Sequence, residues 1–229
     1  MDAVTGRRPG ANPWMDTMRR STMRLRAAAA LFFGSAAPAV LAHHPMGGAV
    51  PQTAWHSVLS GLAHPVIGAD HLLFIVAAAV AAACSGVAGA TALRLLLAFV
   101  VTGVAGTLLR VPGIELPFAE AAVGASLLGV AALLWARWRG TAAAMALACV
   151  AGLLHGQAYG EAVVGAEATP VLAYLVGLAI VQSMIAFAGF QAARRGRLVA
   201  PAAFGHAQSA LAVVAAATGG WMLALGAIA

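Results

Sequence analysis

Apolar residues fill most of this chain, in runs of about twenty that are interrupted by arginine, proline and glycine. Runs of this length can cross the hydrocarbon core of a bilayer as helices. The alternating segments of roughly ten residues that build a transmembrane β-barrel are not seen. The pattern therefore predicts an all-α, polytopic membrane helix bundle. Its six transmembrane helices are expected within residues 64–229, near 64–84, 93–109, 116–135, 142–163, 170–192 and 204–227.

The composition supports lipid as the solvent for this bundle. The chain is 62% hydrophobic and 9% charged, and its mean hydropathy is +0.91. A soluble domain with a polar shell is far more charged than this. Alanine, glycine, leucine and valine dominate the apolar runs, and the small residues among them let membrane helices pack closely.

The first 42 residues have the layout of a secretory signal peptide. A basic start is followed by a short apolar centre and by small residues, so residues 1–42 are predicted to be cleaved. Met15, Met18 and Met23 are alternative starts, because the basic region is unusually long when counted from the first residue. Residues 43–63 are too polar to span and are expected to form a periplasmic or interfacial N-terminal segment.

The formal net charge of +6 arises from 13 basic residues, all of them arginine, and seven acidic residues. The positions of the arginines are more informative than their number. Six precede residue 27, so the charge does not indicate a nucleic-acid partner. If residue 43 lies outside, the outward loops hold only Arg110, whereas the inward loops hold Arg94, Arg137, Arg139, Arg194, Arg195 and Arg197. This asymmetry follows the positive-inside rule. It predicts a multi-pass protein of the bacterial inner membrane with a periplasmic mature N-terminus.

Five ionisable residues lie near the predicted outer ends of two spans. His64, Asp70 and His71 occupy the start of the first span, and His155 and Glu161 occupy the last third of the fourth. Burying such groups costs about 2.5 to 3.5 kcal/mol for an aspartate on insertion scales, so their positions indicate function. On one helix, two residues seven apart share a face, and an aspartate beside them can ligate or orient an imidazole.

The helical rise places His71 and His155 at similar depths, about 10 and 12 Å below the outer ends of their spans. Imidazoles and carboxylates together suit Ni²⁺, Co²⁺ or Zn²⁺. The alternative is that each histidine is a core residue bonded to a backbone carbonyl. The pairing of two such motifs at one depth favours a divalent-metal site.

Other polar residues are weaker candidates for the same site. Glu120 lies one turn into the third span and can approach from the same side. His43 and His44 would stand at the mature N-terminus, where they either capture metal or remain solvated. Three further polar positions, His206, Gln208 and Gln182, either line an exit path or form hydrogen bonds between helices.

The two motifs resemble a known family. His64-x₅-Asp70-His71 and the segment from His155 to Glu161, HGQAYGE, look like the signature motifs of the HupE/UreJ nickel and cobalt permeases. The resemblance extends to the leader, the histidines after it and the six-span plan. Leu154 stands where the family often has phenylalanine, which is an apolar exchange. The resemblance implies a permease, not an enzyme, that moves nickel or cobalt inward as its substrate.

The residues leave other functions open. A P-loop is excluded because the chain has no lysine, so facilitated diffusion or secondary transport is expected. An intramembrane zinc-dependent hydrolase would use the same ligands with Glu161 as the base, although HExxH and GxSxG are missing. A non-transporting accessory protein for metalloenzyme assembly is a further alternative. Divalent metal and lipid are the expected partners, and a homo-oligomer is left open.

Overall fold

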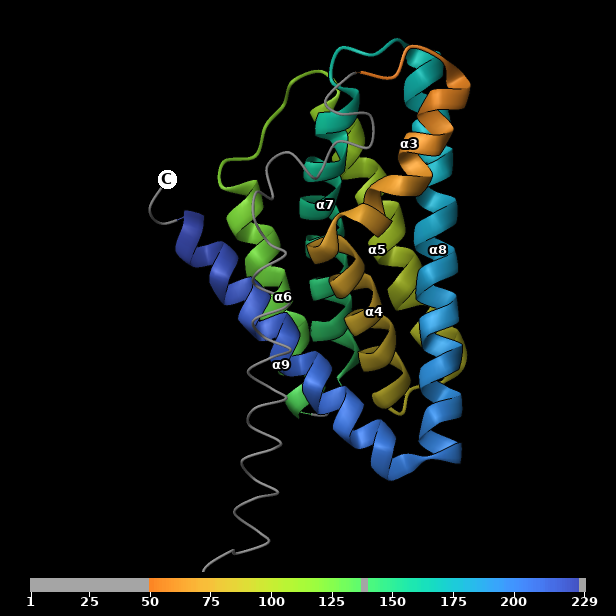
Figure 1. Cartoon of the computed structure of the whole chain (residues 1–229), viewed down its shortest axis with the longest axis vertical. Coiled ribbons are helices and arrows are strands. Elements are labelled where there is room, and N and C mark those ends of the chain that lie inside the picture. The colour runs from red at the N-terminus through yellow and green to blue at the C-terminus, as the bar shows by residue number, and fades with distance from the viewer. Residues whose placement is uncertain (1–49, 137–139, 227–229) are drawn as a thin grey trace, which may run out of the picture. The chain divides into compact units, whose positions relative to one another are not determined.

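The computed structural model describes residues 50–136 and 140–226, and within them every regular element is a helix (Figure 1). The elements are α3 (Ala54–Ile67), α4 (Ala69–Cys84), α5 (Gly89–Arg110), α6 (Ala119–Ala136), α7 (Thr141–Gly160), the short 3₁₀ helix η1 (Glu161–Val163), α8 (Ala168–Val199) and α9 (Pro201–Gly226). The predicted signal peptide lies outside the described residues.

Five of these helices, α5 to α9, are long and apolar enough to cross a membrane. The bent pair of α3 and α4 makes a sixth span if the two are counted together. The prediction of an all-α membrane bundle is therefore confirmed. The predicted span 93–109 corresponds to Gly89–Arg110, while the span predicted at 170–192 continues as a helix to Val199.

The first span differs from its prediction. Residues 64–84 are not one helix, because the chain bends by 72° between α3 and α4. Gly68 lies at this break with an extended backbone, and Pro65 within α3 has no N–H to donate to the preceding turn. A Cβ atom at Gly68 would lie 2.6 Å from Cδ2 of His71, so glycine leaves room for that ring.

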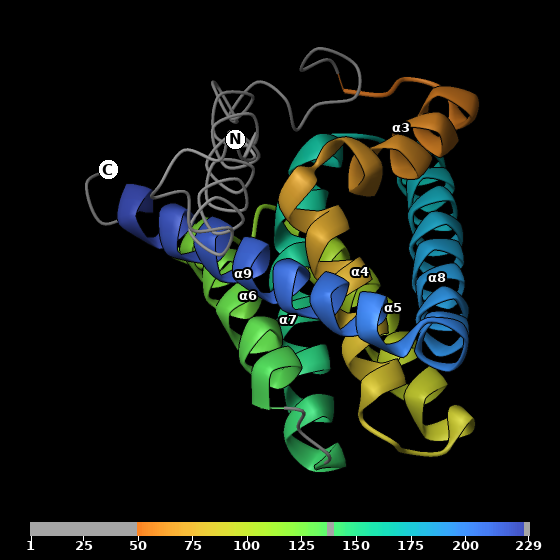
Figure 2. The same cartoon turned by 60° about the horizontal axis from the view of Figure 1, so that its bottom comes forward.

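Helix α4 lies among the other helices and contacts α3, α5, α6, α8 and α9 (Figures 1 and 2). Three further pairs pack along much of their length, namely α5 with α7, α3 with α8, and α6 with α9. The last of these helices crosses α6 and α4 obliquely (Figure 1). This arrangement brings α3, α4, α7 and α8, which are distant in sequence, around one polar centre.

Glycines let these helix pairs approach closely. A Cβ atom at Gly106 of α5 would lie 3.0 Å from Cα of Gly156 in α7. One at Gly124 of α6 would lie 3.0 Å from the carbonyl oxygen of Gly219 in α9. At Gly61 of α3 it would collide with the backbone of α8. Small residues therefore determine the distance between helices here, as expected for packing within lipid.

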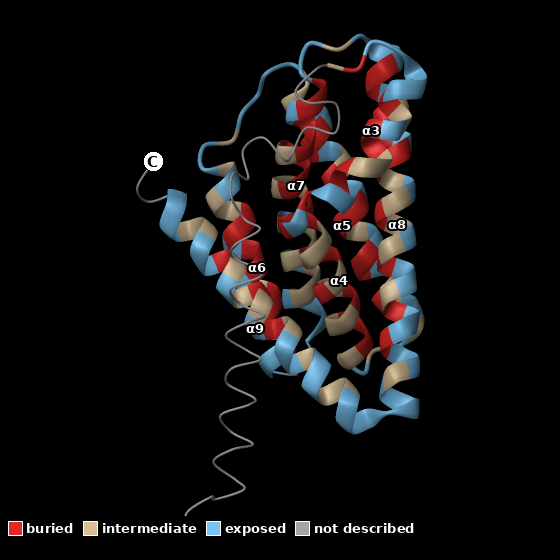
Figure 3. Cartoon of the chain, viewed as in Figure 1, coloured by how far each residue is buried: buried red, intermediate tan, exposed pale blue. Residues whose placement is uncertain are grey.

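Buried residues lie mainly on the sides of the helices that face one another, and exposed residues lie along the outward sides (Figure 3). The outward sides are themselves apolar and include Val101, Leu172 and Met184. Lipid tails solvate such side chains, so this exposure fits a membrane protein. The polar residues that are buried include three histidines and one aspartate.

Candidate metal site

Three histidines from three helices meet inside the bundle. His64 of α3, His71 of α4 and His155 of α7 are each at most 1% exposed. The ring centroids of His64 and His71 are 5.7 Å apart, and those of His71 and His155 are 5.0 Å apart. We call these three rings the histidine cluster. The structure thus brings together the histidines of both sequence motifs.

The route by which His64 and His71 meet is not the predicted one. A shared face of one straight helix was expected, but the break at Gly68 places the two residues on different helices. His64 then contacts His71, and His71 contacts His155. The bend between α3 and α4, and not a shared helix face, brings the two rings together. The seven-residue spacing alone therefore does not explain the cluster.

Asp70 borders the cluster from the first turn of α4. It is 8% exposed, and its Oδ2 atom lies 3.4 Å from Nδ1 of His71. A carboxylate in the first turn is favoured by the partial positive charge at a helix N-terminus. Asp70 is therefore placed to orient His71 and to add negative charge beside the histidine cluster.

Hydrogen bonds define the tautomer of His155. Ser126 Oγ donates to the carbonyl oxygen of Val123 at 2.7 Å and lies 3.0 Å from Nε2 of His155. A hydroxyl has a single hydrogen, so Ser126 accepts from Nε2–H of His155. In the neutral ring Nδ1 is then an acceptor, and it lies 2.8 Å from Nδ1 of His71. His71 therefore donates from Nδ1 to His155.

The same argument applies to His64. The Tyr174 hydroxyl donates to the carbonyl oxygen of Tyr159 at 2.9 Å and lies 2.8 Å from Nδ1 of His64. Tyr174 must therefore accept from Nδ1–H of His64. In their neutral forms, His64 and His71 then both carry their lone pairs on Nε2. A hydrogen bond from one ring nitrogen commonly fixes the tautomer of a metal-binding histidine in this way.

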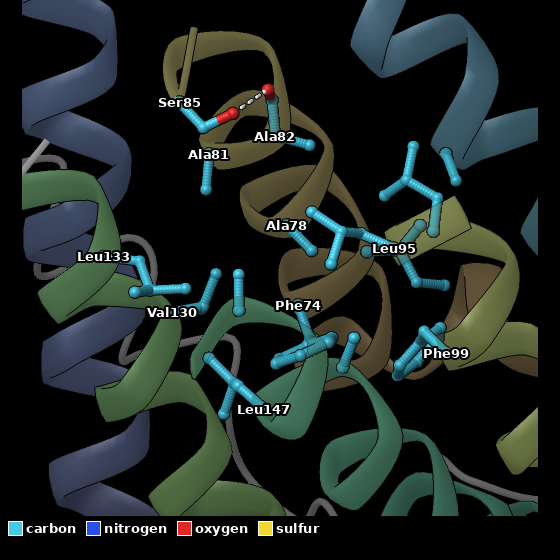
Figure 4. Close-up of a pocket in the computed structure, with 15 residues that line it drawn as sticks. Phe74, Ala78, Ala81, Ala82, Ser85, Leu95, Phe99, Val130, Leu133 and Leu147 are labelled. Atoms are coloured by element: carbon cyan, nitrogen blue, oxygen red, sulfur yellow. Dashed lines mark hydrogen bonds between the residues drawn. The ribbon is translucent and has the colours of Figure 1, made fainter. Parts of the chain in front are cut away.

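Aromatic rings enclose the histidine cluster. The Tyr159 ring centroid lies 4.4 Å from that of His71, and Phe74 and Phe99 stack at 5.0 Å from each other. Both phenylalanines contact His155 and also line a largely apolar cavity of about 50 Å³ among α4 to α8 (Figure 4). The cluster is therefore closed on this side by aromatic rings, with apolar side chains beyond them.

Two predicted ligands are not brought into the cluster. Glu161 is exposed at the start of η1, and Glu120 is exposed in the first turn of α6. His43 and His44 lie outside the described residues. Within residues 50–136 and 140–226, no three His, Cys, Asp or Glu side chains are arranged to hold a metal ion at one point.

Sequence interpretation missed two residues that hold the cluster. Tyr174 and Ser126 lie in apolar spans and belong to neither motif. The chain has only two tyrosines, and both are fully buried against histidine rings. A tyrosine within an otherwise aliphatic span was the signal that could have identified Tyr174, because buried hydroxyls need a partner.

These features define a class of protein, a multi-span helical membrane protein with a buried cluster of histidines. The family model described as HupE / UreJ protein matches residues 28–222. The chain belongs to this family, which is associated with nickel and cobalt transport. No curated protein and no solved structure matches the chain.

Proposed function

We propose that this protein is a permease that carries Ni²⁺ or Co²⁺ from the periplasm to the cytoplasm through the histidine cluster. The observation that supports this proposal most strongly is that His64, His71 and His155 meet inside a membrane bundle, with Asp70 beside them. Imidazole nitrogens suit these two metals, and a carboxylate offsets part of their charge.

The hydrogen-bond pattern supports metal binding over a purely structural role. Nδ1 of His64 and Nδ1 of His71 both act as donors, which leaves Nε2 of each ring as the atom with a lone pair. The two Nε2 atoms would form an initial ligand pair, and the Asp70 carboxylate, which lies beside Nδ1 of His71, would add negative charge. Nδ1 of His155 faces Nδ1 of His71, so His155 would orient His71 through the hydrogen bond between α4 and α7.

The exposed carboxylates have a different role in this proposal. The backbone N–H of Leu116 donates to Oε1 of Gln157, so the segment before α6 lies beside the end of α7. Glu120 and Glu161 are therefore assigned to the mouth of the path, where they attract the hydrated cation. His43 and His44 would serve the same capture step at the mature N-terminus.

The membrane potential can drive this movement without a nucleotide. An inside-negative potential of 100 mV favours inward movement of a divalent ion by about 4.6 kcal/mol, twice the single-charge value. The hydrolase alternative has less support, because it needs Glu161 as a base and this residue is exposed while the histidines are buried.

The test is metal uptake by vesicles that contain the purified full chain. We expect His64→Ala, Asp70→Asn and His155→Ala each to lower Ni²⁺ uptake at least tenfold. His206→Ala is the matched control, because His206 is exposed on α9. Normal uptake by all three cluster variants would contradict the proposal. No uptake by the unmodified protein, with Ni²⁺ still bound, would favour the accessory-protein alternative.

A further inference from the structure

Three glutamines lie within core-facing parts of the described helices, and two of them have both amide atoms bonded. Gln157 donates from Nε2 to a backbone carbonyl of α5 and accepts at Oε1 from Leu116, each at 3.1 Å. Gln208 donates to the carbonyl oxygen of Leu134 at 2.9 Å and accepts from the thiol of Cys84 at 3.4 Å. Both glutamines therefore join neighbouring helices.

Gln182 of α8 is different. It is 0% exposed, yet neither its Nε2 nor its Oε1 has a hydrogen-bond partner among the described residues. The same holds for the hydroxyl of Tyr159, which is also 0% exposed. Lipid offers no hydrogen bonds, so buried polar atoms of this kind call for an occupant such as water or an ion.

These two side chains lie near each other and next to the histidine cluster. The Tyr159 hydroxyl and the Gln182 amide are close enough to interact, although no hydrogen bond of normal geometry joins them. The Tyr159 ring contacts the rings of His64 and His71, with centroids 5.2 and 4.4 Å away. The Tyr159 hydroxyl and the Gln182 amide therefore form a buried polar group next to the histidine cluster.

Within this buried polar group, Gln182 lies farther from the histidine cluster than Tyr159 does. On α8 it follows Tyr174, which holds His64, by eight residues, or about 12 Å of helical rise. Its Oε1 would lie 3.8 Å from a Cβ atom at Gly103, so the side chain reaches across to α5. Gln182 thus places an amide between α5, α7 and α8, beyond the rings.

We propose that Oε1 of Gln182 and the Tyr159 hydroxyl form a second, inner station that receives the divalent cation from the histidine cluster, directly or through a retained water. This inference rests on the proposed transport function. Neutral oxygen ligands bind Ni²⁺ and Co²⁺ less strongly than imidazole does. A weaker second station suits a path, because an ion that is held too tightly does not leave.

The experiment separates binding from movement. Purified full-length variants are compared for equilibrium Ni²⁺ binding in detergent and for the initial rate of Ni²⁺ uptake into vesicles at saturating Ni²⁺. Gln182→Leu should lower the uptake rate at least tenfold and leave the binding affinity within twofold. Tyr159→Phe should lower the rate about fivefold. Gln208→Leu is the matched control and should keep the rate per folded protein.

Two results would overturn the inner station. One is uptake by Gln182→Leu within twofold of the unmodified protein. The other is an equal loss of affinity and rate, which would mean that the substitution disturbs the histidine cluster. If Gln182→Leu does not fold, Gln182→Met makes the same test with a flexible side chain. An unmodified protein that takes up no Ni²⁺ would refute the transport function itself. Failure of the inner station is therefore distinguishable from failure of the transport function.

Discussion

The Nδ1 atoms of His71 and His155 lie 2.8 Å apart, and the hydrogen bond between them joins α4 to α7 across 84 residues of sequence. Asp70 lies beside the same Nδ1 atom of His71, and Ser126 holds His155 at its other nitrogen, Nε2. The cluster is therefore part of a continuous chain of polar contacts. Predictions for its supporting residues follow from the direction of each hydrogen bond.

Tyr174→Phe removes the hydroxyl that accepts from Nδ1 of His64. We expect Ni²⁺ binding to weaken about 10- to 100-fold, as is usual when a metal-binding histidine loses the hydrogen-bond partner of its other ring nitrogen. Titration of the purified variant with Ni²⁺ measures the change. If the hydroxyl acts through His64, adding Tyr174→Phe to His64→Ala causes little further loss. Additive losses would contradict this role.

Ser126→Ala leaves Nε2–H of His155 without its acceptor. The ring then loses the contact that fixes its tautomer, and we expect Ni²⁺ binding to weaken about tenfold. Ser209→Ala is the control, because that hydroxyl is exposed and donates to a carbonyl of its own helix at 3.0 Å. Equal affinities for the two variants would show that the Ser126 contact is not needed.

Gly68→Ala tests whether room for His71 is required. The backbone of Gly68, with φ of −73°, suits alanine, so the effect of the substitution is steric. The added Cβ would press against Cδ2 of His71, and we expect Ni²⁺ uptake to fall at least fivefold in folded protein. Gly205→Ala has no atom within 4 Å of the new Cβ and should behave as the unmodified protein does. Normal uptake by Gly68→Ala would mean that the ring can move aside.

Gly156→Ala tests the close approach of α5 and α7. A Cβ atom there would meet the backbone of Gly103 and of Gly106, and such overpacking typically costs about 1 to 3 kcal/mol. We expect a lower melting temperature in detergent. Gly220→Ala adds a methyl group in open space and should leave the melting temperature within error. Matching melting temperatures for both variants would contradict tight packing at this contact.

Apolar runs were sufficient to locate most of the helices. The predicted spans 116–135 and 142–163 correspond to α6 and to α7 with η1, because lipid selects for long uninterrupted apolar segments. The bend before α4 could not be predicted in this way. Ser57 and Ser60 lower the apolar character of α3, although both are buried against the bundle. Hydropathy therefore described α3 as an interfacial segment.

The candidate site could be predicted only in part, because the sequence indicates the depth of a residue in its span but not the direction of its side chain. Position in a span indicates depth, so His71 and His155 were expected at one level, and their ring centroids lie 5.0 Å apart. Depth does not show which way a side chain points around the helix axis. Glu161 and Glu120 were also expected to approach the site, but both are exposed. In an all-apolar bundle, periodicity does not distinguish the lipid side from the core side.

The break at Gly68 has a geometric consequence for the two histidines on either side of it. His64 and His71 belong to helices that meet at 72°, so the separation of their nitrogen donors depends on that angle. A chelating pair built on one straight helix would have a fixed bite. Here a change in the backbone torsions of a single residue would widen or narrow the distance between the two rings, and with it the size of the ion that the proposed site would accept.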